Sequence, residues 1–244
     1  MKKKSNFSGQ IGFVLAAAGS AVGVGNLWRF PYLVARDGGG LFLIIYLVRV
    51  LTFGFTLLTT DISIGRKTGQ SAIKAYETMR PGWKKLGFLT FMVPVLIMTY
   101  YAVIGGWILK YFIVFLTGAC GDAAKDSYFT SFITNTSSVW FGLIFMLVTA
   151  LIVYNGVEGG IERCSKFIMP VLLVMVVGIA IFSLTLRSKG ADGVVRTGLD
   201  GLKVYMIPDV SGLTVSRFLQ VTLDAMSQLF FSLSVSMGIM ITYG

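Results

Sequence analysis

The stretch AAAGSAVGVGNLWRFPY, residues 16–32, lies within a strongly apolar segment near the start of the chain. Polar and helix-disfavouring residues are concentrated in it: Gly19, Gly23, Gly25, Asn26, Arg29 and Pro31. Each glycine destabilises a helix interior by about 1 kcal/mol relative to alanine, and a charge in hydrocarbon is costly unless it faces a cavity or a partner. The stretch therefore predicts either a closely packed membrane helix or a membrane helix that is broken at mid-depth.

The composition is that of an integral membrane protein. Of the 244 residues, 55% are hydrophobic and 13% are charged, and the mean hydropathy is +0.78. Soluble domains carry about 25% charged residues, and their apolar runs are shorter than the roughly 20 residues that cross a bilayer. The net charge of +10 is therefore assigned to loops at the membrane surface, and not to nucleic-acid binding.

The residues that most enzymes and metal sites use are scarce. The chain has no histidine, which excludes a histidine metal site or a histidine general base. Its two cysteines, Cys120 and Cys164, fit no zinc-site spacing, and the predicted topology places them on opposite sides of the membrane. Because no nucleophile–base pair is evident, we expect that the protein is not an enzyme.

Six apolar runs are long enough to cross a bilayer. They predict one all-α transmembrane domain, residues 1–244, with spans near 11–35, 41–64, 88–117, 138–155, 164–186 and 218–243. Helices are expected because a span must satisfy its own backbone hydrogen bonds.

Basic residues set the predicted orientation. One side collects Lys2, Lys3, Lys4, Arg66, Lys67, Lys74, Arg80, Lys84, Lys85, Arg163 and Lys166. The bases of the other side are spread over longer loops and are partly offset by aspartates. The positive-inside rule then predicts a cytoplasmic N-terminus. Residues 68–87 are compatible both with a short interfacial helix and with a solvated basic loop.

A broken helix at residues 16–32 would do chemistry that a continuous one cannot. It frees backbone carbonyls, which ligate small cations, and it presents the N-terminus of a half-helix, which holds anions. Close packing through Gly19 and Gly23 is the alternative. A second interruption is indicated by LFFSLSVSMGIM, residues 229–240, where serines alternate with apolar residues. There the alternative is that the serines bond back to their own helix.

The interrupted spans and three further motifs resemble the neurotransmitter:sodium symporter family, in particular its bacterial amino-acid branch with the leucine-transporter fold. The motifs are GSAVGVGNLWRFPYLVARDGGGLF at 19–42, DISIGR at 61–66, YYAVIGGW at 100–107, GVEGGIERCSKFIMP at 156–170 and FFSLSVSMG at 230–238. The resemblance implies the first five-helix repeat plus the sixth span, with broken first and sixth helices. It implies sodium-coupled symport of a neutral amino acid by alternating access, in the inner (plasma) membrane.

The resemblance also implies two sodium sites. The carbonyl of Ala21 and the side chains of Asn26 and Ser232 would ligate the first sodium. The carbonyls of Gly19 and Val22 would contribute to the second. Hard cations prefer oxygen ligands, and these positions offer backbone, amide and hydroxyl oxygens.

An amino-acid substrate would lie between the two breaks. Its carboxylate would meet the amides near Val24 and Gly25, the Tyr101 hydroxyl and the first sodium. Its ammonium would meet carbonyls of Ala21, Phe231 and Ser232, with Ser234 nearby. The implied substrate residues are Ala21, Val24, Gly25, Ile97, Tyr101, Ile104, Phe231, Ser232, Ser234 and Met237. For the apolar members of this set, ordinary packing is the alternative.

Three positions refine the expectation. Gly23 stands where monoamine carriers of the family have an aspartate, which favours amino acids over monoamines. Arg29 resembles the outer-gate arginine. Lys4 and Phe7 depart from the arginine and tryptophan usual at the inner gate.

Chloride dependence stays open. Tyr46, Gln228 and Ser232 match positions that help to bind chloride in chloride-dependent relatives, but a partner from the next span would decide the matter.

The family typically has about twelve spans, so the chain is expected to be a fragment or a truncated gene product that does not transport alone. A non-transporting substrate-binding or sensor-like protein, or a sodium channel-like protein, is the alternative function. Asp61, Arg49 and Asp224, near or in spans, are interpreted as structural or gating groups.

Overall fold

The computed structural model describes residues 9–189 and 193–244. The predictions for Lys2, Lys3, Lys4 and Phe7 fall outside these residues. The described chain is almost entirely helical, as expected for a polypeptide that must satisfy its backbone hydrogen bonds within each segment.

The elements follow one another with short connections. They are α1 (Gln10–Ala21), η1 (Gly25–Arg29), α2 (Phe30–Arg36), α3 (Gly40–Arg49), η2 (Val50–Gly54), α4 (Phe55–Thr68), α5 (Ala72–Met79), α6 (Lys84–Leu116), α7 (Cys120–Ala123), α8 (Asp126–Ile133), α9 (Ser137–Tyr154), η3 (Val157–Glu162), α10 (Arg163–Thr185), β1 (Arg187–Lys189), β2 (Val195–Thr197), α11 (Gly198–Met206), α12 (Val215–Ser232) and α13 (Ile239–Tyr243). The η segments are π-helical. The strands form an antiparallel hairpin with Arg187 opposite Thr197.

Each predicted span overlaps a helix or a pair of helices. Four continuous helices are long and apolar enough to cross a membrane, namely Gly40–Thr68, Lys84–Leu116, Ser137–Tyr154 and Val157–Thr185. A fifth is formed when α1 is joined to the η1–α2 helix, which is bent from it by 57°. The sixth predicted span corresponds to α12 and α13, which are separated by residues 233–238.

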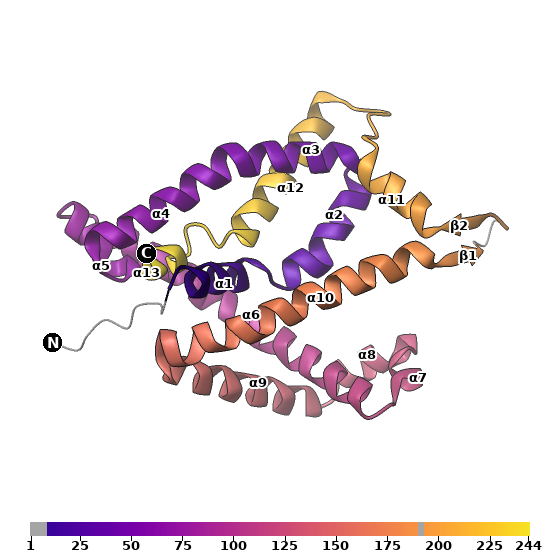
Figure 1. The fold of residues 1–244 in the computed structure, drawn as a ribbon, viewed down its shortest axis with the longest axis horizontal. Coiled ribbons are helices and arrows are strands. Elements are labelled where there is room, and N and C mark those ends of the chain that lie inside the picture. The colour runs from indigo at the N-terminus through magenta and orange to yellow at the C-terminus, as the bar shows by residue number, and fades with distance from the viewer. Residues whose placement is uncertain (1–8, 190–192) are drawn as a thin grey trace.

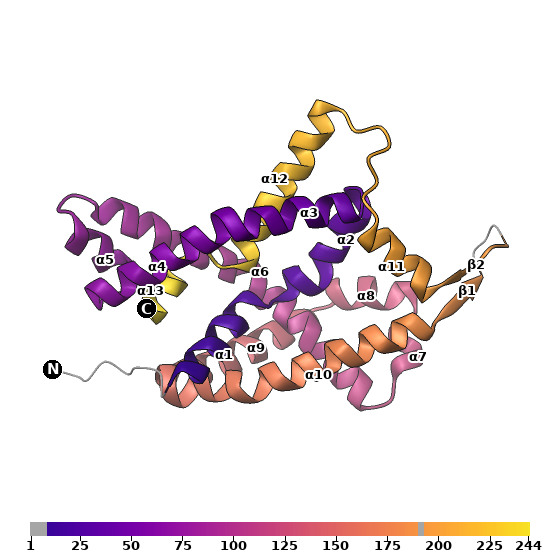
Figure 2. The ribbon, with the colours of Figure 1, turned by 45° about the horizontal axis from the view of Figure 1, so that its top comes forward.

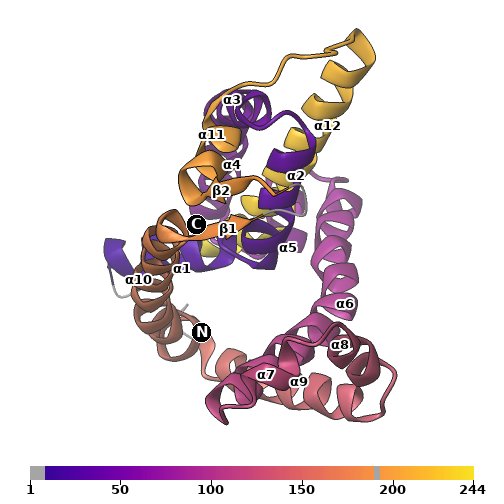
Figure 3. The ribbon, with the colours of Figure 1, turned by 90° about the vertical axis from the view of Figure 1, so that its right-hand side faces the viewer.

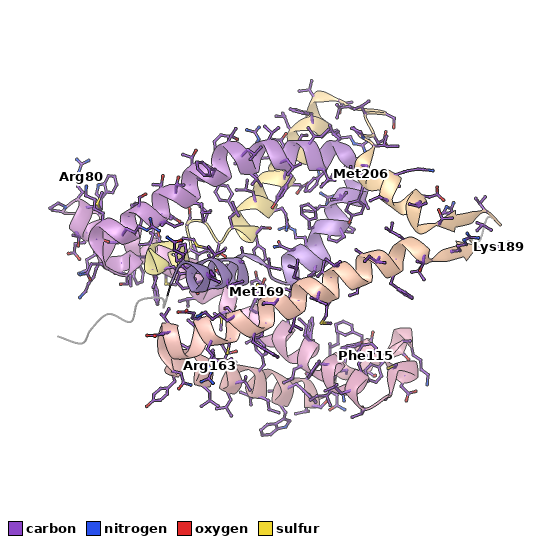
Figure 4. All side chains as sticks on the ribbon, viewed as in Figure 1. Arg80, Phe115, Arg163, Met169, Lys189 and Met206 are labelled. Atoms are coloured by element: carbon purple, nitrogen blue, oxygen red, sulfur yellow. The ribbon has the colours of Figure 1, made fainter. Side chains whose placement is uncertain are left out.

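Charged ends of the helices lie on two opposite sides of the molecule. In Figure 4, Arg80 and Arg163 lie toward one end of the molecule, whereas Lys189 lies at the other end. Arg163 and Lys189 bracket α10. This arrangement matches the predicted distribution of loops, in which the α4–α5 and η3 regions share one side.

Loop 68–87 contains a helix, as one of its two interpretations predicts. Ala72 and Ala75 on α5 are buried against Ile241 of α13. Its other face is exposed, so α5 is a packed amphipathic helix between α4 and α6 (Figure 1).

The packing divides the helices into groups. The α6 helix packs on α9 and α5, α1 packs on α10, α13 packs on α4, and α12 packs on α3. Figure 3, the end-on view, shows α7, α8 and α9 apart from α2, α3 and α12, with α6 running from the first group toward the second. The two halves of each broken span therefore pack on different helices: α1 on α10 but α2 on α3, and α13 on α4 but α12 on α3 (Figure 2).

The turn between α2 and α3 depends on glycine. Gly39 has φ +57°, a conformation that side-chain-bearing residues rarely adopt. A Cβ there would overlap the carbonyl of Val204 on α11. The turn is joined to the chain after α11 by a bridge between Gly39 and Pro208.

Candidate functional site

The first broken helix opens where the glycines and Asn26 predicted it. The α1 helix ends at Ala21, and Val22 is extended with φ −92° and ψ 103°. The η1 helix begins at Gly25. Because the first amides of a helix have no partner within it, the residues between these ends leave backbone donors and carbonyl acceptors facing the middle of the structure.

The sixth span opens differently. The α12 helix ends at Ser232 and α13 begins at Ile239. Between them Ser234 and Ser236 have φ +50° and +62°, a left-handed conformation that is uncommon for residues other than glycine. The alternative of an unbroken helix with serines bonded to its own backbone is therefore wrong.

Asn26 joins the two breaks. Its Nδ2 donates to the Ala21 carbonyl over 2.8 Å, which bridges the first break. Its Oδ1 accepts from Ser232 Oγ over 2.6 Å and from Gln228 Nε2 over 3.3 Å. The three oxygens predicted for the first sodium, on Ala21, Asn26 and Ser232, therefore lie next to one another.

Gln228 supports this arrangement from α12. Its side chain is fully buried, and Nε2 also donates to the Gly25 carbonyl over 3.2 Å and to Ser232 Oγ over 3.1 Å. Its Oε1 has no hydrogen-bond partner among the described residues. A buried oxygen without a donor is unusual.

Two further contacts hold the strained sixth-span segment. Ser234 Oγ donates to the Ser20 carbonyl over 3.1 Å. The backbone amide of Ser236 donates to Asp61 Oδ2 on α4 over 3.3 Å, and Asp61 is 7% exposed. The left-handed turn is thus anchored to both α1 and α4.

Cavities lie on both sides of the Tyr101 and Phe231 rings, whose centroids are 6.0 Å apart. One cavity, of about 820 Å³, extends toward α5 and α13. The other, of about 390 Å³, extends toward Arg29. Both rings line both cavities, so they form the partition between them.

The residues predicted for the substrate gather around this partition. The larger cavity is lined by Ala21, Ile97, Tyr101, Phe231, Ser234 and Met237 among others, and the smaller by Val24, Gly25, Tyr101, Ile104 and Phe231 among others. Ser232 is buried beside them. The structure therefore brings the whole predicted set together.

Glycine is required at one of these positions and leaves room at another. A Cβ on Gly25 would lie 2.6 Å from Cδ1 of Phe231, so that ring packs directly on the backbone. A Cβ on Gly23 would meet only the Tyr101 hydroxyl, at an ordinary 3.6 Å. Space beside the first break is therefore open at Gly23 and closed by a ring at Gly25.

The predicted residues of the second sodium site lie at the end of α1. Gly19 and Val22 line the larger cavity. Ser165 of α10 also lines it, and its Oγ would be 3.2 Å from a Cβ on Gly19. The α1–α10 contact thus places a further hydroxyl beside these two residues.

The residues predicted for the gate and for chloride lie at different places in the fold. Arg29 lines the smaller cavity and donates to Ser227 Oγ over 3.4 Å; within the described residues it forms no ion pair. Gln228 and Ser232 are bonded to each other. Tyr46 lies in a neighbouring aromatic cluster, with its ring 5.0 Å from that of Phe30.

Sequence reasoning missed three contributions to the site. Ser20 was not singled out although it bonds to Ser234 twice. Asp61 was interpreted only as structural or gating, and Gln228 only as a chloride residue. A polar residue among apolar ones was the available signal for all three, but nothing in the local pattern named their partners.

Comparisons with known proteins identify the family. A family model described as the sodium:neurotransmitter symporter family matches residues 4–135 and 123–244. The chain is 34% identical to the uncharacterized sodium-dependent transporter YhdH of Bacillus subtilis, over 99% of this chain and 52% of that protein. It is 31% identical to the sodium-dependent neutral amino acid transporter B(0)AT3 of Rattus norvegicus, over 97% of this chain and 41% of that protein.

A solved structure has the same fold. The crystal structure of MhsT in complex with L-phenylalanine matches with a TM-score of 0.83 and 37% identity, over 99% of this chain and 53% of that chain. The chain thus spans about half the length of the curated relatives that it matches.

Proposed function

This chain belongs to the sodium:neurotransmitter symporter family, and we propose that it forms the sodium and substrate site of a transporter for a neutral amino acid. Its relatives and structural neighbour are transporters and not enzymes. The observation that carries the proposal is the cluster of Ala21, Asn26 and Ser232 oxygens at two helix breaks.

The cluster suits sodium. Its oxygens are a carbonyl, an amide and a hydroxyl, all neutral, and hard cations prefer oxygen ligands. Each oxygen now takes part in a hydrogen bond within the cluster. An ion there would replace those hydrogen bonds. The Oε1 atom of Gln228, close to the cluster, accepts no hydrogen bond from the described residues.

The substrate's two charges find complementary groups on either side of Tyr101. The amides at the start of η1, at Val24 and Gly25, and the positive end of that helix favour a carboxylate. The Tyr101 hydroxyl, beside Gly23, donates to the same group. The carbonyls of Ala21 and Ser232 favour the ammonium.

Coupling follows from this shared site. A sodium ligated by Asn26 and Ser232 would contact the substrate carboxylate, so each ligand tightens the binding of the other. Inward movement of sodium releases about 2.3 kcal/mol per charge per 100 mV, which drives uptake. Alternating access would open the cavity on one side of the Tyr101–Phe231 partition and then that on the other.

Gly23 supports amino acids over amines. Only the Tyr101 hydroxyl would contact a Cβ at this position, so a carboxylate fits beside the break, and the chain supplies no acidic group at that position. Apolar Ile97, Ile104 and Met237 around the cavities favour a neutral, hydrophobic side chain. MhsT was solved with L-phenylalanine, which makes this amino acid the first probe.

The test compares ligands that differ only in the carboxylate. We expect L-phenylalanine, but not phenethylamine, to bind to the purified protein in lipid nanodiscs, and to do so in sodium chloride but not in choline chloride. Binding of phenethylamine in preference to L-phenylalanine would overturn the amino-acid assignment. Unsaturable sodium flux without substrate dependence would instead identify a channel.

A further inference from the structure

A cluster of charges joins the end of α2 in the first span to the middle of α12 in the sixth span, away from the proposed site. Arg36, the last residue of α2, donates through Nε to Asp37 Oδ1 over 2.7 Å and through Nη2 to Asp37 Oδ2 over 3.0 Å. The same Nη2 forms an ion pair with Asp224 on α12. The guanidinium carbon also lies 5.7 Å from the centroid of the Tyr32 ring.

We call the η1–α2 helix of the first span and α12 of the sixth span the outer half-helices. The Arg36–Asp224 ion pair is the polar contact between them that lies farthest from the two breaks. Further in, Arg29 donates to Ser227, and the series ends where Ser232 donates to Asn26. Residue numbers rise along η1 and α2 as they fall along α12. The two half-helices therefore run antiparallel, and these contacts lie along the half of α12 that is nearest its break.

Apolar packing alone would not fix this register. Leu33, Val34, Val221 and Ala225 form a buried cluster between the half-helices. Apolar burial is non-directional, so the cluster opposes separation more than sliding. The Arg36 guanidinium forms two hydrogen bonds to the Asp37 carboxylate, and such a fork has a fixed geometry. Its ion pair with Asp224 then sets the position of α2 along α12.

One member of this cluster is buried, which distinguishes it from an ordinary surface ion pair. Exposed pairs contribute little; here the Arg36 side chain is 39% exposed and that of Asp224 is 24% exposed, but that of Asp37 is only 7% exposed. Asp37 also follows the C-terminus of α2, where the helix dipole disfavours a carboxylate. Removing Arg36 would leave a buried negative charge without its cation.

The inner half-helices pack elsewhere. The α1 helix contacts α10 and η3, and α13 contacts α4 and α5. The outer half-helices therefore pack on different helices from the inner ones. Within each span the two halves are connected by the residues of the break.

We propose that Arg36, Asp37 and Asp224 form a charge latch that makes the outer halves of the first and sixth spans one rigid body. The latch thereby sets the separation of Asn26 and Ser232. Ser232 lies about 12 Å further along α12 than Asp224. Its members are positioning residues, because they contact neither the proposed ion nor the substrate. The rigidity can be measured without any ligand, whereas the effect on sodium rests on the proposed function.

Distance measurements test the rigidity. Spin labels at exposed Ala35 and Val215, in a background with Cys120→Ser and Cys164→Ser, report how α2 lies along α12 by double electron–electron resonance in nanodiscs. We expect one narrow distance distribution in this background.

Charge reversal provides the variants. Arg36→Asp and Asp224→Arg should each broaden the distribution, and the double reversal should restore it. Asp224→Asn is the milder variant that keeps the experiment interpretable if a reversal fails to fold. As a matched control, Lys125→Asp breaks an exposed ion pair with Asp122 and should change nothing. An unchanged width in Arg36→Asp, or a double reversal that stays broad, would overturn the latch.

Sodium binding tests the positioning role. The sodium concentration for half-maximal binding of L-phenylalanine should rise roughly threefold to tenfold in Asp224→Asn and return in the double reversal. Broadened distances with an unchanged sodium requirement would overturn this role. A wild-type protein that binds no sodium would contradict the proposed function, while the distance measurement would still decide the latch.

Discussion

The Ser232 hydroxyl donates to the Asn26 side-chain oxygen over 2.6 Å, although the two residues are 206 positions apart in the sequence. Each lies at the end of a half-helix, Asn26 in η1 and Ser232 at the end of α12. This contact joins the two interrupted spans and defines the position proposed for the first sodium.

Removing the Ser232 hydroxyl should weaken sodium binding. Ser232→Ala deletes one neutral oxygen ligand, and we expect the sodium concentration for half-maximal substrate binding to rise roughly tenfold, which corresponds to about 1.4 kcal/mol. Ser232→Thr keeps the hydroxyl and should stay within about twofold of wild type. Ser183→Ala, on the exposed surface of α10, is the control. Equal sodium requirements in the alanine and threonine variants would contradict the ligand role.

A methyl group at Gly25 should displace the Phe231 ring. A Cβ there would lie 2.6 Å from Cδ1 of that ring, and small-to-large changes in close packing typically cost about 1–3 kcal/mol. We expect Gly25→Ala to reduce affinity for L-phenylalanine at least about tenfold, measured by equilibrium binding. Gly178→Ala, where a Cβ would meet nothing within 4 Å, should bind normally; comparable losses in both would refute this packing argument.

Asp61 should be needed as a hydrogen-bond acceptor. Its Oδ2 accepts from the amide of Ser236, which has φ +62°. Asp61→Ala leaves that amide unpaired and should lower the free energy of unfolding by about 1–3 kcal/mol. Asp61→Asn keeps an accepting oxygen and should be milder. Thermal unfolding in detergent compares them, and a loss in the asparagine variant as large as in alanine would show that charge, not acceptance, matters.

The start of α11 should persist to low pH. Bonds from the Thr197 backbone and hydroxyl, together with Lys203, lower the pKa of Asp200 from 3.8 to about 2. A carboxylate with a depressed folded-state pKa stabilises the fold above its unfolded pKa, and this contribution is lost as the pH falls through the folded value.

The amide resonance of Thr197 reports this titration. It should therefore shift near pH 2 in the wild type, and Asp200→Asn should abolish the transition. A midpoint near pH 4 would contradict the capping geometry.

The first break could be predicted from the sequence because its causes are local. Gly23 and Gly25 disfavour a helix and Asn26 offers a side chain that bonds to the Ala21 carbonyl five residues earlier, so one short window contains the whole signal. The sixth-span break was less certain from sequence, since serines also fit a continuous helix.

The partners across the fold could not be predicted in this way. The left-handed turn at Ser236 is bonded to Asp61, and Arg36 at the end of α2 pairs with Asp224 in the middle of α12. The sequence shows that a residue is polar and lies within an apolar span. It does not show which distant residue forms its hydrogen bond or ion pair. The resemblance to a known family supplied the site residues, and the geometry supplied Ser20 and the connecting role of Gln228.

The central claim is that sodium and an amino acid bind together between the two broken helices, and linkage tests it most directly. The measurement is the dissociation constant of L-phenylalanine for the purified protein in nanodiscs, as sodium replaces choline at constant ionic strength. The account predicts that the constant falls at least about tenfold as sodium saturates, and that this dependence weakens in Ser232→Ala. A dissociation constant that is the same in sodium and in choline would contradict it.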